Sequence, residues 1–449
     1  MSTRAFWSLA AVALLVRLAV LGTNFSHAQP VITMQDSDSY LQGGASLAAH
    51  GAIVGADGKP AWGRPPGYPV FLALTFLTGL ATPDRPAGVL ALQGLVSALA
   101  VALAARAASV LGGRAAGLLA GAILILEPSG LSYSNLVLSE TLYACVLMAA
   151  VCASWRWLTA PGLDNLAWFA LLVAVLPIIR PVALYLPWLL VPIVAWSAPG
   201  TVRLKAVVLF LAITLLPSAA WTGRNWQCFG TPFFDQTGPL GKAIFARQVE
   251  IRAVPEVESQ GTIWTGNAEP WQRYYSERGP LPTPLAMKRQ ASYFRETVTQ
   301  HPVAALVEWA YTGLTMMGAP DSWLRAQLTG RPVEIEGHPA EFEEGSIGSR
   351  LRWLLGTGPL LPLILLGMAV SLGGVLMLPV FAWSARTGSP PLRSFILIVT
   401  TVVVYHLVIS SFVRYQAERY RVPIIPCLAI VLVVGALALV TAARRRPVS

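Results

Sequence analysis

Long apolar runs alternate with short polar connectors along most of the chain. About ten of these runs are long enough, or nearly so, to cross the roughly 30 Å hydrocarbon core of a bilayer as an α-helix. The pattern therefore predicts an all-α polytopic membrane protein with about ten transmembrane helices. The predicted spans are 5–21, 88–108, 115–131, 136–155, 166–179, 182–196, 206–221, 354–383, 394–413 and 422–443.

Two stretches interrupt this pattern. The run 68–81 has only about 14 residues and follows prolines, so we expect an interfacial or re-entrant helix in the first outer loop. The stretch 222–353 is rich in Pro, Gly, Gln and charges and is too long for a connector. It predicts one large outer-face loop region, in which 302–319 is typical of an amphipathic helix lying on the membrane. The expected modules are 1–221 with its first outer loop at 22–87, the loop region 222–353, and the C-terminal transmembrane helices 354–449.

Composition agrees with a membrane protein. Of the 449 residues, 55% are hydrophobic and 12% are charged, which is too little charge to cover a soluble domain. The formal net charge of +10 is explained by basic residues retained at the cytoplasmic ends of spans. The expected partner is therefore the lipid bilayer, and nucleic acid is not expected.

Basic residues in the short connectors predict the orientation. With a cytoplasmic N-terminus, they all lie inside, as the positive-inside rule requires, and the C-terminus is cytoplasmic too. Arg17, inside the first run, is expected to tolerate lysine. The basic residues predicted to lie on the cytoplasmic side are Arg106, Arg114, Arg156, Arg203, Lys205, Arg386, Arg393 and the tail from Arg444 to Arg446.

Three acidic residues lie outside in this topology. Asp36 and Asp38 are two positions apart in the first outer loop, and Glu140 begins a span at its outer end. Two such carboxylates suit a general base or a hard cation, so a divalent cation at Asp36 and Asp38 is left open. The alternatives are a helix cap for the aspartates and a favourable helix-dipole position for Glu140.

Several arginines also gather at outer ends of apolar runs, against the positive-inside bias. A phosphate group would explain them, because the guanidinium fork matches phosphate oxygens. The alternative is that each extends to lipid headgroups. These residues are Arg64, Arg180, Arg224, Arg419 and Arg421.

A series of short motifs carries a family resemblance. In chain order they are Asp36-x-x-x-Tyr40, Arg64-Pro-Pro-Gly-Tyr68-Pro, Glu127-Pro with Ser139-Glu140-Thr-Leu, Arg180-Pro, Arg224-Asn-Trp with Phe229-Gly-Thr-Pro, and Glu418-Arg419-Tyr420-Arg421-Val-Pro. Their order resembles the C-type-fold (GT-C) membrane glycosyltransferases, and is similar to the bacterial branch of protein O-mannosyltransferase-like and aminoarabinose transferase-like enzymes.

The resemblance implies a function and roles for these residues. It implies transfer of a sugar, with inversion, from a polyprenyl-phosphate donor to a glycan, lipid or protein acceptor at the periplasmic face of a bacterial inner membrane. Asp36 would lie at the reaction centre with Asp38 and Glu140, and Arg64 near the donor phosphate. Tyr40, Tyr68 and Tyr420 would contact substrate. The family often has Glu directly after the Asp, whereas this chain has Ser37, so the division of roles between Asp36 and Asp38 stays open.

Two other classes of function fit part of the pattern. A transporter or lipid flippase would need ionisable groups or broken helices near mid-membrane in paired halves, whereas the runs here are almost purely apolar. An outer-face ligase or acyltransferase of another fold would rely on a histidine with an acidic partner. The outer candidates His27, His50, His301 and His338 have no such partner nearby in sequence.

Overall fold

The structure is a computed structural model that describes residues 1–34, 36–55, 58–61, 64–235, 237–254, 284–330, 357–413 and 417–444. These residues form helices, and the only β-structure among them is two isolated bridges. The helices are α1 (Thr3–Phe25), α2 (Ser37–His50), α3 (Gly67–Leu77), α4 (Ala87–Leu126), α5 (Pro128–Tyr133), α6 (Glu140–Thr159), α7 (Leu163–Ile179), η1 (Pro181–Ala183), α8 (Leu186–Ser197), η2 (Gly200–Val202), α9 (Arg203–Phe229), α10 (Thr237–Ala253), α13 (Pro284–Gln300), α14 (Pro302–Gly318), α15 (Trp323–Thr329), η3 (Gly358–Leu360), α18 (Leu361–Ser384), η4 (Ala385–Thr387), α19 (Pro390–Ser410), α20 (Ala417–Arg421), η5 (Val422–Ile424) and α21 (Ile425–Arg444).

The apolar helices confirm the predicted polytopic all-α class. Within the described residues, seven helices are long and apolar enough to cross a membrane by length and composition, and α3, α7 and η1 with α8 are three shorter apolar segments. The 40-residue α4 is two helices, because its backbone leaves helical geometry at Gly112 and Gly113. Gly113 has φ +77°, which only glycine adopts readily. Counting α4 as two arms and leaving out the 11-residue α3 gives ten apolar segments, as the hydrophobic pattern predicts.

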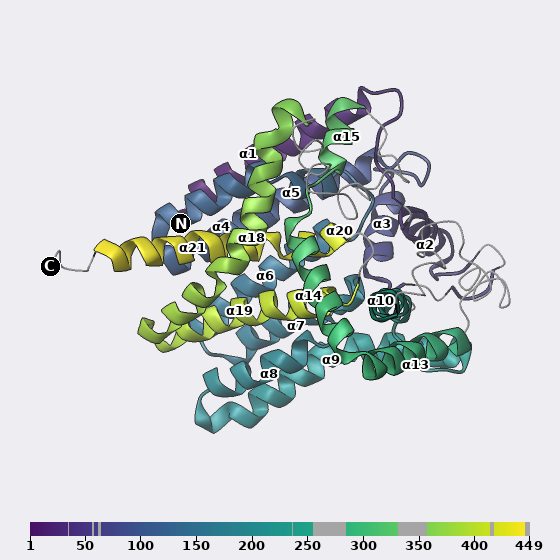
Figure 1. Cartoon of the computed structure of the whole chain (residues 1–449). Helices are drawn as coiled ribbons and strands as arrows, with labels where there is room; N and C mark the ends of the chain where they lie inside the picture. The colour runs from purple at the N-terminus through teal and green to yellow at the C-terminus, as the bar shows by residue number, and fades with distance from the viewer. Residues whose placement is uncertain are drawn as a thin grey trace.

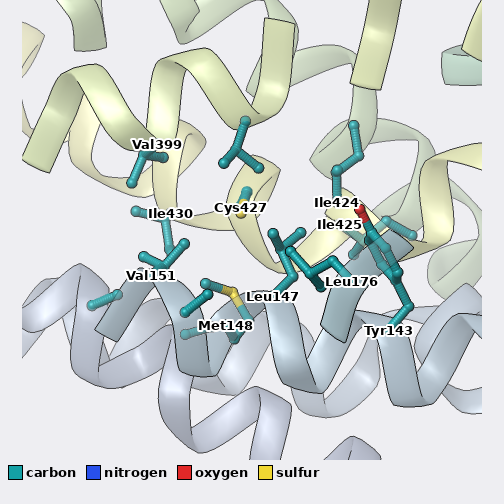
Figure 2. Close-up of a cluster of buried hydrophobic side chains, with 14 of the residues drawn as sticks. Tyr143, Leu147, Met148, Val151, Leu176, Val399, Ile424, Ile425, Cys427 and Ile430 are labelled. Atoms are coloured by element: carbon teal, nitrogen blue, oxygen red, sulfur yellow. The ribbon is translucent and has the colours of Figure 1, made fainter. Parts of the chain in front are cut away.

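The central layer is built on α6. Figure 2 shows Tyr143, Leu147, Met148 and Val151 of this helix facing Ile424, Ile425, Cys427 and Ile430 of η5 and α21. These side chains are almost completely buried, and apolar residues on both sides of α6 explain why it runs through the interior of the bundle.

Several of the helices that are not candidate spans gather at one end of the bundle. In Figure 1, α2, α3, α10 and α13 lie at the end opposite the two chain termini, and α14 runs across the direction of α19 and α21. The run 68–81 forms the 11-residue α3, too short to span a bilayer as a helix. Along α14, Val303, Leu306, Val307 and Leu314 expose an apolar stripe, as expected for a helix on a membrane surface.

Candidate active site

The N-terminus of α2 presents Asp36 to the site. Ser37 anchors the turn, because its hydroxyl donates to the Val137 carbonyl at 2.9 Å and accepts from the Met34 amide at 2.9 Å. Asp36 occupies the N-cap position, yet its side chain caps no amide of the helix. The helix-cap explanation therefore does not account for Asp36.

The Asp36 carboxylate lies between two guanidinium groups. Its Oδ2 accepts from Nη1 of Arg419 at 2.6 Å, and its Oδ1 accepts from Nη2 of Arg64. Burial alone would raise the pKa of this carboxyl group, but the charges and hydrogen bonds of Arg419 and Arg64 lower it to about 2. The side chain is still 27% exposed, so a substrate can reach it.

Glu140 forms the buried half of the same network. Its side chain is fully buried, and its Oε1 accepts from Nη1 of Arg180 at 2.6 Å and from Nε of Arg419. Arg419 thus bridges Glu140 and Asp36. The second carboxylate oxygen, Oε2, is buried and accepts no hydrogen bond from the described residues, which leaves an acceptor for a water or a substrate hydroxyl.

Arg64 reaches the site because α3 begins against the end of α7. A Cβ atom at Gly67 would lie 2.7 Å from the Ile178 carbonyl oxygen, so only glycine permits this close approach. Arg64 donates from Nε to Ser39 at 2.9 Å and from Nη1 to the Tyr40 hydroxyl at 3.1 Å. Burial lowers the pKa of Arg64, but Tyr40 and Asp36 raise it overall, so the guanidinium stays charged.

Tyrosines line the network to different extents. The Tyr40 hydroxyl is 3.2 Å from the Ser139 hydroxyl, and the Tyr40 ring packs edge-on against the Tyr68 ring with 4.8 Å between their centroids. The Arg180 guanidinium lies 5.8 Å from the centre of the Tyr420 ring. Tyr68 is fully buried and donates to Gln93. It therefore supports Tyr40 from the interior.

The structure places three other predicted site residues elsewhere. Asp38 is exposed in the first turn of α2, because positions i and i+2 of a helix face different directions. Arg224 packs 4.9 Å from the Trp221 ring and donates to the Ile53 carbonyl. Arg421 donates to the carbonyls of Met316 and Met317, both at 3.1 Å, so it holds the end of α14.

A second buried polar group was not anticipated from the sequence. Arg17 is 2% exposed and donates to Ser97 at 2.7 Å, to the Ala13 carbonyl at 3.2 Å and to the Leu124 carbonyl at 3.2 Å. The expectation that lysine would serve as well overlooked these acceptors, which lie on α1 and on both arms of α4. The signal was present, because a charged residue inside an apolar run commonly faces the protein interior.

The donor set around Asp36 does not fit a divalent cation. Both of its oxygens accept from guanidinium groups, and Asp38 is exposed on α2. No group of three or more metal-ligating side chains occurs among the described residues. The cluster instead carries three guanidinium charges against two carboxylates, an excess of one positive charge that suits an anion.

Comparison with known proteins identifies the fold. No protein-family model and no curated protein matches the sequence. Among solved structures, the chain is similar to the oligosaccharyltransferase AglB from Archaeoglobus fulgidus in complex with an inhibitory peptide and a dolichol-phosphate, with a TM-score of 0.53 and 12% identity over 98% of this chain and 50% of AglB. An Archaeoglobus fulgidus oligosaccharyltransferase in the apo form gives a TM-score of 0.54 and 12% identity over 99% of this chain and 51% of that chain.

A likeness of this kind defines the class of fold. The protein shares the fold of this part of the oligosaccharyltransferase AglB, and it spans about half the length of AglB. ArnT from Cupriavidus metallidurans, bound to undecaprenyl phosphate, also aligns, at 16% identity over 99% of this chain and 79% of ArnT. Its TM-score of 0.38 is too low to support a closer relationship.

Proposed function

We propose that the protein is a membrane glycosyltransferase that moves a sugar, with inversion, from a polyprenyl-phosphate donor to an acceptor at the outer face of a bacterial inner membrane. One observation carries the proposal. Arg419 joins Asp36 and Glu140 in a single network with Arg64 and Arg180. The GT-C fold, and the dolichol-phosphate bound by AglB, support a lipid phosphate as donor.

The charge of the network suits the donor. A sugar linked to a polyprenyl phosphate is a phosphodiester with one negative charge, which the single excess positive charge would balance. When the sugar departs, the phosphate gains a second negative charge. Guanidinium groups that are already in place and partly shielded from water stabilise such developing charge strongly. Arg64 and Arg419 are the proposed phosphate ligands because each donates to the accessible Asp36.

The chemical step is a single displacement. The acceptor hydroxyl or amine attacks the anomeric carbon from the face opposite the phosphate, which inverts the configuration. The bond from that carbon to the phosphate oxygen breaks, and its electron pair leaves with the phosphate. Asp36 accepts the proton of the acceptor, as a carboxylate within hydrogen-bond reach can.

Binding of the donor would also make Asp36 a better base. Its pKa of about 2 results from the hydrogen bonds and charges of Arg419 and Arg64. A phosphate that takes over part of these contacts weakens their hold on the carboxylate, so its affinity for a proton rises. Glu140, fully buried between Arg180 and Arg419, would position these arginines and would not itself exchange a proton.

The test is release of the lipid carrier by the purified chain. Protein in nanodiscs is supplied with a panel of labelled polyprenyl-phosphate sugars and acceptors, and free polyprenyl phosphate and labelled product are measured together. Stoichiometric appearance of both supports a transferase. Movement of intact lipid-linked sugar across proteoliposomes without release would identify a flippase instead and overturn the proposal.

A further inference from the structure

A second cavity lies at the opposite end of the bundle from Asp36. It has a volume of about 190 Å³ and is lined by α4, α6 and α19, including Arg106, Cys152, Trp155, Arg156 and Phe395. Arg156 lies sixteen residues after Glu140 along α6, about 24 Å at the helical rise. Nothing in the proposed transfer reaction uses this cavity.

The cavity lies close to the end of the bundle that carries the termini. The N-terminal ammonium of Met1 donates to Ser109 at 3.5 Å, one helical turn from Arg106. Arg106 precedes the fold-back at Gly112 by six residues, or about 9 Å of helix. This distance from the fold-back is comparable to the thickness of the polar headgroup layer, which adds several ångströms to each side of the hydrocarbon core.

The lining combines cationic and aromatic groups. The guanidinium groups of Arg106 and Arg156 are exposed, and neither forms an ion pair with a carboxylate in the part of the chain that the structure describes. Trp155 and Phe395 pack together with ring centroids 5.3 Å apart. Two unpaired arginines beside a hollow favour an anion that accepts hydrogen bonds from both, and the aromatic side suits an amphipathic ligand.

We infer that this cavity binds a phosphate-bearing anion, and that its occupant in the membrane is the headgroup of an anionic phospholipid. A headgroup phosphate reaches the guanidinium groups at this depth while its acyl chains stay in the bilayer. Basic pockets between transmembrane helices on the cytoplasmic side bind such headgroups. A freely dissolved phosphate offers the same oxygens to the arginines but has no apolar part to place beside Trp155 and Phe395.

The test measures lipid binding to the full chain in a neutral detergent. Phosphatidylglycerol, phosphatidylcholine with the same acyl chains, and inorganic phosphate are titrated separately, with bound lipid read by native mass spectrometry and saturable stabilisation by thermal unfolding. We expect phosphatidylglycerol to bind at least about tenfold more tightly than phosphatidylcholine, the difference that one or two charge-assisted hydrogen bonds supply.

Paired double variants locate the effect. R106Q/R156Q should lose at least about tenfold in phosphatidylglycerol affinity, and R106K/R156K, which keeps the charge, should lose less. R114Q/R203Q removes the same charge from exposed arginines that do not line the cavity and should bind as the wild type does. Equal binding of the two lipids, or equal losses in both glutamine doubles, would overturn the site. Saturation by inorganic phosphate without preference for phosphatidylglycerol would overturn the lipid assignment.

Discussion

Asp36 and Arg419 are 383 positions apart in the sequence, yet Nη1 of Arg419 lies 2.6 Å from Oδ2 of Asp36. The contact joins the segment between α1 and α2 to the segment that leads into the last apolar helix. Because Arg419 also binds the buried Glu140, the two ends of the chain meet α6 in one charged network. The proposed activity therefore depends on the packing of the whole chain.

Replacing Asp36 by asparagine should reduce turnover by at least about a hundredfold, the scale of lost general-base catalysis. Asn keeps the size of the side chain but removes the charge that Arg64 and Arg419 contact. Asp38→Asn is the matched control, since Asp38 is exposed, and it should change turnover only slightly. Carrier release at equal expression is the measurement, and similar mild losses in both variants would rule out Asp36 as the base.

Arg419 and Arg421 should respond differently to lysine. Arg419→Lys should weaken use of the lipid-linked donor by about 1.5 to 3 kcal/mol, because an ammonium does not reproduce two charge-assisted guanidinium contacts. Arg421→Lys should instead lower the melting temperature, because Arg421 holds two carbonyls at the end of α14. The KM for the donor and thermal unfolding separate the two effects. A larger donor KM effect in Arg421→Lys would contradict the assignment.

Arg17→Lys should destabilise the protein by about 2 kcal/mol or more, because Arg17 donates from three separate guanidinium nitrogens, whose positions a single ammonium nitrogen cannot all occupy, and buried unsatisfied acceptors cost about 1 to 3 kcal/mol each. The acceptors are Ser97 and the carbonyls of Ala13 and Leu124. Arg4 lies in the same helix and is exposed, so Arg4→Lys provides the control. Thermal unfolding in detergent measures both, and equal melting temperatures would show that Arg17 has no structural role.

Asp36 should remain ionised throughout the physiological pH range. Its pKa is lowered from 3.8 to about 2 in the folded protein, so its contribution to stability is complete above about pH 4 and is lost as the pH falls through about 2. The difference in melting temperature between wild type and Asp36→Asn should therefore be constant from pH 8 to pH 5. A difference that changes between pH 7 and pH 5 would mean that the folded-state pKa of Asp36 is raised into that range, which would contradict the lowering by Arg64 and Arg419.

The proposed orientation can be tested with topology reporters. A reporter inserted after Ala81 should lie outside, because α3 ends at Leu77 and its 11 residues are too few to cross a bilayer. A reporter after Gly112, at the fold-back of α4, should lie in the cytoplasm. A cytoplasmic reporter after Ala81 would mean that the run 68–81 spans the membrane. Every later connector would then change sides, and Glu140 would lie on the opposite side from Asp36. That result would contradict the network in which Arg419 contacts both residues.

The amino-acid sequence by itself determined the class of protein and the number of apolar segments. The physical reason is local: hydrocarbon excludes unpaired backbone and charged groups, so any spanning helix must appear as an apolar run of sufficient length. The same reasoning selected Asp36, Glu140, Arg64, Arg180 and Arg419 as polar residues at the ends of such runs, before any contact between them was visible.

Only the tertiary structure decided which of the candidates meet. Asp38 and Arg421 each lie two positions after a residue of the network, and two positions along a helix turn a side chain by about 200°. The Asp38 side chain is therefore exposed and points away from Asp36. The Arg421 side chain points towards α14. Arg17 is satisfied by both arms of α4. Such pairings depend on how helices rotate and pack across hundreds of residues, and no local pattern of polar and apolar residues encodes that rotation.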